Sequence, residues 1–185
     1  MISDLVEDLV SDVQATLINF IELENPTANA HYSLSTAWVA SDDFEIEFEF
    51  STSVPAGSTD AGAMGQADVT ENFIQIQDSA NRVAVKLAGD ARVAVAKTDH
   101  LDGKLHTFKL LRVGTNLKFF IDGVELSSTT TSGSPVSIGL LGALTVGGVP
   151  SQFFNGIISN PKLTDLTTPS NSLKFGLNNL IANTE

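Results

Sequence analysis

Apolar and acidic residues alternate without exception in the segment Phe44-Glu45-Ile46-Glu47-Phe48-Glu49-Phe50. Successive side chains of an extended strand point to opposite faces of a sheet, so the apolar residues share one face and the glutamates share the other. This pattern is typical of an antiparallel strand that packs one face on a core and exposes the other to water. The segment therefore predicts a half-buried β-strand.

Further runs of apolar and β-branched residues follow, each bounded by Gly, Asn, Asp, Ser or Pro, and they predict strands at 73–77, 82–87, 92–97, 106–113, 117–121, 136–141 and 156–163. The Asp122-Gly123 pair is a strong signal for a tight hairpin turn, so 106–126 predicts a β-meander. Residues 51–72 are rich in Ser, Thr, Gly and Ala and are too many for a hairpin turn. We expect a long surface loop there.

The N-terminal segment has a different period. Its apolar residues recur at helical spacing with acidic residues between them, and the stripe consists of Ile2, Val6, Leu9, Val13 and Phe20. We expect an amphipathic helix within 1–24, a linker at 25–30 around Pro26, and a β-domain over 31–185. Because a helix this short is marginal alone, its apolar stripe needs a cover: a homotrimeric bundle, a larger particle, or its own β-domain.

Charge and composition exclude several classes of protein. The net charge is −12, and 15 of the 22 acidic residues precede Arg82, the first basic residue, so residues 1–81 carry −15 and the rest +3. A surface this acidic repels phosphate backbones, and we predict no nucleic-acid partner. No apolar run is long enough to span a bilayer, and Met1-Ile2-Ser3-Asp4 lacks the basic start of a signal peptide, so we expect no membrane insertion. The chain has no cysteine, which excludes disulfides.

Three separated motifs resemble the laminin G-like domains of the concanavalin A-like lectin and glucanase superfamily. Residues 43–48 read D-F-E-I-E-F, residues 106–112 and 117–123 read H-x-F-x-L-x-R and L-x-F-x-I-D-G, and residues 153–163 read F-F-N-G-I-I-S-N-P-K-L. The resemblance covers about 31–165 and implies an all-β, two-sheet antiparallel jelly-roll sandwich, here preceded by one N-terminal helix. The fold hosts lectins, hydrolases and structural domains, so it does not by itself assign an activity.

The layout of an acidic helix, one sandwich and no cysteine is similar to laminin G-like modules of tailed-phage virions. This resemblance implies a non-enzymatic virion structural protein, namely a capsid decoration, head-fibre or tail-fibre component that is made in the host cytoplasm. Its helix would form a homotrimer or bind other virion proteins, and its sandwich would bind host-surface glycans. A free carbohydrate-binding lectin and a glycoside hydrolase are the alternatives.

The hydrolase alternative rests on Glu45, Glu47 and Glu49. Glucanases of this superfamily carry a similar row, two glutamates with an aspartate between them, and retaining glycosidases need two carboxyl groups about 5 to 5.5 Å apart. The middle residue here is Glu, and one Trp and one Tyr are too few to line a sugar cleft. We therefore predict a solvated polar face and no catalytic residue.

Ligand contacts are predicted at Tyr32 and Trp38, whose rings could stack on sugars, and at the turn residue Asn116; the alternative for both rings is core packing. Oxygen ligands for calcium could come from Asp60, Asp68, Asp99, Asp102 and Asn116. No spacing resembles a calcium loop, so we predict no metal and no cofactor. We expect Asp122 to act as a turn former and His106 to serve as a structural hydrogen-bonding residue.

Overall fold

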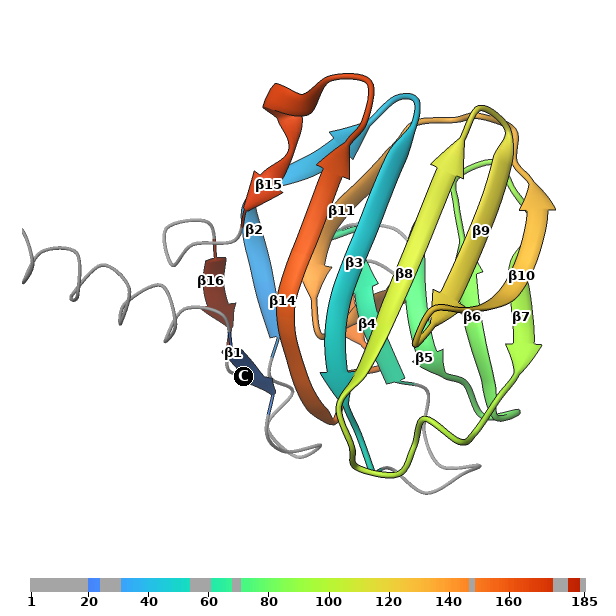
Figure 1. Ribbon diagram of the computed structural model, residues 1–185. Coiled ribbons are helices and arrows are strands. Elements are labelled where there is room, and N and C mark those ends of the chain that lie inside the picture. Colours follow the sequence, from blue (N-terminus) through green and yellow to red (C-terminus); the bar gives the residue numbers. More distant parts are fainter. Residues whose placement is uncertain are drawn as a thin grey trace, which may run out of the picture.

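The computed structural model describes residues 20–23, 31–53, 61–67, 71–146, 149–174 and 180–183. These residues form two antiparallel sheets that face each other in a sandwich (Figure 1). Within these ranges the helical structure consists of one 3₁₀ turn, η1 (Pro169–Asn171), and no helix is long and apolar enough to cross a membrane. The predicted jelly-roll sandwich is confirmed.

The first sheet has the strand order β1-β14-β3-β8-β9-β10, and β15 pairs with β14 beside η1. Its strands are β1 (Phe20–Leu23), β14 (Gly156–Asp165), β3 (Phe44–Ser51), β8 (His106–Val113), β9 (Asn116–Ile121), β10 (Val124–Thr130) and β15 (Leu173–Lys174).

The second sheet has the strand order β16-β2-β11-β4-β5-β6-β7. Its strands are β16 (Leu180–Asn183), β2 (His31–Ala40), β11 (Val136–Leu141), β4 (Ala61–Gly65), β5 (Phe73–Gln77), β6 (Arg82–Lys86) and β7 (Val93–Ala96). A separate hairpin, β12 (Leu144–Val146) with β13 (Val149–Ser151), packs on the outer face of this sheet through Leu144.

The core lies between the sheets and follows the alternation of β3. Phe44, Ile46, Phe48 and Phe50 are fully buried, whereas the glutamates between them are half-exposed. Phe48 pairs in register with Phe108 of β8, and their rings stack with centroids 5.1 Å apart. Burying side chains of this size contributes about 1.5 to 3 kcal/mol each to the stability of the sandwich.

The predicted loop at 51–72 is wrong in its middle part, because Ala61–Gly65 forms strand β4 between β11 and β5. The reason is steric. A Cβ atom on Gly62 would lie 2.8 Å from the backbone oxygen of Gln152 and 2.9 Å from Cδ2 of Leu144, so the strand must use small residues beneath the β12–β13 hairpin. Small residues have low strand propensity, which hid this strand from sequence patterning.

The predicted end of the N-terminal helix is also wrong, because Phe20–Leu23 forms β1 and pairs antiparallel with β14. This pairing satisfies the backbone groups along an edge of β14 that would otherwise face solvent. The sandwich therefore includes residues before 31. Residues 1–19, with Ile2, Val6, Leu9 and Val13, and the predicted linker at 25–30 lie outside the described residues.

Candidate functional site

The glutamate row of β3 lies on the outer face of the first sheet, and each carboxylate already has a partner. Glu45 forms an ion pair with Lys109, and Glu47 with Lys162 at 3.0 Å. Glu49 accepts hydrogen bonds from Oγ of Ser159 at 3.0 Å and Nδ2 of Asn160 at 2.6 Å. This arrangement is a charge-paired sheet face, in agreement with the polar-face interpretation.

The structure does not bring Tyr32, Trp38 and Asn116 together. Trp38 is 2% exposed, packs edge-on against Phe44 and donates from its indole nitrogen to the backbone of Asn171, so it occupies the core position that the packing alternative predicts. Tyr32 is half-buried on β2 and packs against the core. Asn116 is exposed at the start of β9, in the other sheet.

The predicted calcium candidates do not converge either. Asp99 is paired with Lys97, and Asp102 is paired with Lys104. Asp60 and Asp68 lie outside the described residues. Among the residues that the structure does describe, no three His, Cys, Asp or Glu side chains are placed to hold a metal ion.

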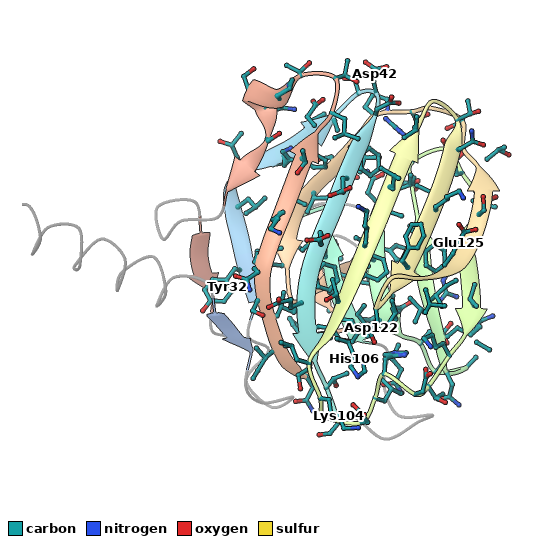
Figure 2. The ribbon with its side chains drawn as sticks, viewed as in Figure 1. Tyr32, Asp42, Lys104, His106, Asp122 and Glu125 are labelled. Carbon is teal, nitrogen blue, oxygen red and sulfur yellow. The ribbon has the colours of Figure 1, made fainter. Side chains whose placement is uncertain are left out.

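His106 bridges two carboxylates at one end of the first sheet (Figure 2). Its Nδ1 lies 2.7 Å from Oδ2 of Asp122, and its Nε2 lies 3.0 Å from Oδ1 of Asp102. Asp122 has the left-handed φ of 51° expected in the turn, and its Oδ1 accepts the backbone N–H of Thr107. The structural roles predicted for His106 and Asp122 are confirmed.

These contacts perturb the ionisation of the pair. Burial alone would lower the pKa of His106, but the hydrogen bonds to Asp122 and Asp102 raise this pKa above its ordinary value. Burial alone would raise the pKa of Asp122, but the hydrogen bond from His106 and the backbone bond from Thr107 lower it. The imidazole therefore ties the start of β8 to the β9–β10 turn.

A second polar cluster, which the sequence analysis did not identify, forms around Asp78 at the end of β5. Asp78 is buried, and its Oδ1 accepts the backbone N–H groups of Ala80 and Arg82, both at 2.9 Å. Its Oδ2 accepts Nε of Arg82 at 2.7 Å and Nη2 of Arg92 at 2.6 Å. Burial alone would raise the pKa of Asp78, but the hydrogen bonds from Arg92 and Arg82 lower it, so the carboxylate is ionised between two guanidinium groups.

The cluster continues through amide side chains across the outer face of the second sheet. Nη2 of Arg92 also donates to Oε1 of Gln75 at 2.8 Å, and Nε2 of Gln75 donates to Oε1 of Gln152 at 3.1 Å. We call Gln75, Asp78, Arg82, Arg92 and Gln152 the Arg–Gln patch. Its arginine side chains are 40% (Arg82) and 34% (Arg92) exposed, so the patch presents guanidinium groups to solvent.

Alternation explains which side chains lie on the outer face of the second sheet. Inward side chains on β5, β6 and β7 belong to the core, so Gln75 points outward, as do Ala84 and Ala94. These two alanines lie side by side in the strand register next to Gln75. Ala84 is fully buried and packs with Phe73 against Leu144 of the β12–β13 hairpin, so the patch meets solvent through Arg82, Arg92 and Gln152.

Solved structures with this architecture come from several kinds of protein. The described chain superposes on domains LG1–3 of the laminin α2 chain (TM-score 0.60, 15% identity), covering 91% of this chain and 31% of that one. It also superposes on the heptameric SAP-like pentraxin of Limulus polyphemus (TM-score 0.58, 12% identity), covering 80% and 75%. The chain has a laminin G-like jelly-roll fold. No protein-family model and no curated protein sequence matches it.

A third neighbour of this laminin G-like fold is the carbohydrate-binding module of the Ruminococcus gnavus IT-sialidase, solved with α2,6 sialyllactose (TM-score 0.52, 12% identity, covering 76% of this chain and 88% of that chain). Identities this low establish the fold alone. The chain spans about a third of the laminin α2 structure and most of the pentraxin and of the sialidase module.

Part of the Arg–Gln patch could have been predicted from the sequence of this laminin G-like fold. The hairpin between 73–77 and 82–87 predicts that Asp78 lies near Arg82, and alternation with Ile74 and Ile76 turns Gln75 outward. Arg92 and Gln152 had no such signal. They reach the patch through the strand register and through the β12–β13 hairpin, which local sequence patterns do not encode.

Proposed function

We propose that this protein is a non-enzymatic, lectin-like module that binds glycans at the Arg–Gln patch. The observation that carries the proposal is a set of linked planar amide and guanidinium groups, in which Gln75 is the buried link and Arg82 and Arg92 reach solvent. Such groups offer paired donors and acceptors in one plane, which suits the neighbouring hydroxyl groups of a sugar ring. The fold supports the proposal, since one neighbour is a carbohydrate-binding module solved with a bound saccharide.

The pairing of the β3 carboxylates favours binding over hydrolysis. A retaining glycosidase needs one carboxyl group as an acid and another as a free nucleophile. Here Lys162 holds Glu47, and Ser159 and Asn160 both donate to Glu49. The row therefore acts as a stable polar surface in our proposal.

A glycan array with the full-length protein tests this function. We expect binding to at least one saccharide, loss of that binding in Arg92→Gln, and unchanged binding in Lys162→Gln, a control on the opposite sheet. Release of reducing sugar from a β-glucan panel, abolished by Glu45→Gln or Glu49→Gln, would replace the lectin with a hydrolase. Failure to bind any saccharide on the array would contradict the proposal.

We also propose that the module works on a tailed-phage virion, as a decoration or fibre protein. This proposal is supported by the predicted helix-plus-sandwich layout and by the acidic apolar-striped segment before residue 20. Detection of the protein in purified, washed virions by mass spectrometry tests it. Absence from such particles while the protein is abundant in the lysate would refute it.

A further inference from the structure

We infer that the Arg–Gln patch recognises a sugar that carries an oxyanion, a carboxylate in the first instance; this inference rests on the proposed glycan-binding function. The inference specifies the class of sugar, because amide groups alone could bind neutral and acidic sugars alike. The argument comes from the charge balance of the patch, the unused donors of its arginines and the rigidity of their support.

Among the described residues, Asp78 is the one carboxylate that forms ion pairs with the two arginines of the patch. Arg82 and Arg92 both pair with Asp78, whereas each lysine whose side chain the structure describes has a carboxylate of its own. Those pairs are Lys86–Glu71, Lys97–Asp99, Lys104–Asp102, Lys109–Glu45, Lys118–Glu125 and Lys162–Glu47. Two guanidinium groups against one carboxylate leave a local surplus of one positive charge in a chain of net charge −12.

The remaining arginine, Arg112, does not belong to this surface. Its guanidinium is buried and donates to the backbone oxygens of Asp42 and Ser134 while it lies over the ring of Phe44. In the described part of the chain, the two exposed guanidinium groups that share an acid are therefore those of the patch.

Each patch arginine has donors left for a ligand. Arg92 uses Nη2 for Asp78 and Gln75, and within the described residues its Nε and Nη1 contact no acceptor. Arg82 uses Nε and Nη2 for Asp78, and its Nη1 likewise has no acceptor there. Each of these free N–H groups can donate a single charge-assisted hydrogen bond to an oxyanion, and such bonds are stronger than those between neutral groups.

The support is organised before a ligand arrives. The Asp78 side chain is 3% exposed and accepts bonds from both guanidinium groups and from two backbone N–H groups. Side chains that are already held lose less conformational entropy on binding than free ones. Lys86, the last residue of β6, forms an ion pair with Glu71, so this pair adds no net charge to the patch.

The overall acidity of the protein selects a small anion over a polyanion. A chain of net charge −12 repels an extended run of phosphates. A single oxyanion is attracted by the positive charge of the patch, and at physiological ionic strength salt screens it from the more distant negative charges of the protein. The hydroxyl groups beside that oxyanion would then contact the amide of Gln152, because Gln75 is 3% exposed and bonded through both amide atoms. An acidic sugar satisfies both halves of the patch.

Matched saccharide pairs that differ only in charge test this inference. We would titrate the full-length protein by calorimetry with trigalacturonate, a glucuronate disaccharide, sialyllactose and sulfated galactose, each beside its methyl ester or desulfated form. We expect at least one acidic form to bind about tenfold or more tightly than its neutral partner. The carboxylate and sulfate arms distinguish the two sources of the oxyanion.

Variants place that preference at the patch. Arg92→Gln should lower the affinity for the acidic form to that for its ester. Arg92→Lys keeps the charge but not the separate N–H donors of a guanidinium, so it should recover only part of the loss. Lys118→Gln, an exposed lysine on the first sheet, is the matched control and should change nothing. Arg92 also holds Asp78, so its replacement could disturb the patch itself. Raising the salt concentration tests the charge interaction in the unmodified protein, and it should lower the affinity for the acidic saccharide but not for its neutral partner.

The outcomes separate the inference from the function on which it rests. Equal binding of acidic and neutral partners, weakened alike by Arg92→Gln, would overturn the oxyanion inference and leave the glycan-binding site intact. Binding of neutral saccharides alone would have the same meaning. No binding of any saccharide would overturn the proposed function itself.

Discussion

The indole Nε1 of Trp38 donates a hydrogen bond to the backbone oxygen of Asn171, 3.0 Å away. This bond joins β2 of the second sheet to η1, the turn that follows β14 of the first sheet. The ring itself meets Phe44 edge-on, with centroids 5.9 Å apart. Trp38 therefore links the two layers at one end of the sandwich.

Trp38 is the single tryptophan, so its fluorescence reports on this contact. We expect blue-shifted emission that resists acrylamide quenching and does not change when a saccharide binds. Trp38→Phe should lower the free energy of unfolding by about 1 kcal/mol or somewhat more, through the lost bond and reduced packing, and Trp38→Ala by about 3 to 5 kcal/mol. Urea unfolding measures both. Quenching like that of free tryptophan would contradict the buried position.

The two described histidines with perturbed ionisation should titrate on opposite sides of the ordinary value of 6.5. Burial lowers the pKa of His100, whose Nε2 lies 3.0 Å from the backbone oxygen of Ile76, while the bonds to Asp122 and Asp102 raise the pKa of His106. A titration followed by NMR of the imidazole protons should resolve them. His106→Gln should remove the higher transition, which assigns it.

The same shift makes the stability effect of His106 depend on pH. A group whose pKa is raised by folding stabilises fully below its unfolded pKa, and this contribution is lost as pH rises through the folded pKa. His106→Gln should therefore lower the melting temperature more at pH 5.5 than at pH 9. An equal effect at both pH values would refute the charged bridge.

Gly62 marks the tightest contact beneath the β12–β13 hairpin. A Cβ atom there would meet Leu144 and the backbone oxygen of Gln152, so Gly62→Ala should destabilise by about 1 to 3 kcal/mol, as overpacked sites do. Leu144→Ala in the same chain removes part of the clash, and a double-mutant cycle should show a favourable coupling. Additive effects would show that the hairpin does not press on β4.

The assembly prediction concerns the apolar stripe before β1. If it forms a homotrimeric bundle, Leu9→Glu with Val13→Glu in the full chain should convert a trimer to a monomer in light scattering. Burial of such side chains contributes about 1.5 to 3 kcal/mol each, enough to hold a small bundle together. A monomer before and after the change, with lowered stability after it, would show that the segment packs on its own sandwich.

The sequence predicted those parts of the fold that local patterns encode. Alternation turned Phe48 inward and Glu47 outward, and the Asp122-Gly123 pair marked the hairpin that the structure contains. Strand β4 was missed because its small residues are required by close packing against Leu144, which is far away in the sequence. Phe20 was assigned to a helix because its spacing continues the stripe, whereas pairing with β14 overrides that periodicity.

The candidate site was less predictable than the fold for the same reason. Trp38 and Tyr32 were predicted to contact sugars because their rings can stack on them. Whether a ring can reach a ligand depends on its burial, which is set by the tertiary structure. Gln75 and Gln152 touch across 77 residues of sequence, and no local spacing announces such a contact. The contact between Asp78 and Arg82 could be predicted from the sequence, because a hairpin joins the two residues.

The most direct test of glycan binding at the Arg–Gln patch is a titration of the ¹⁵N-labelled full-length protein with the saccharide that binds most tightly on the array. The side-chain amide signals of Gln75 and Gln152 and the Nε–H signal of Arg92 should shift together and saturate, while the backbone signals of 45–49 on the first sheet stay in place. Saturating shifts confined to the glutamate row or to other loops, with the three patch signals unmoved, would contradict the account.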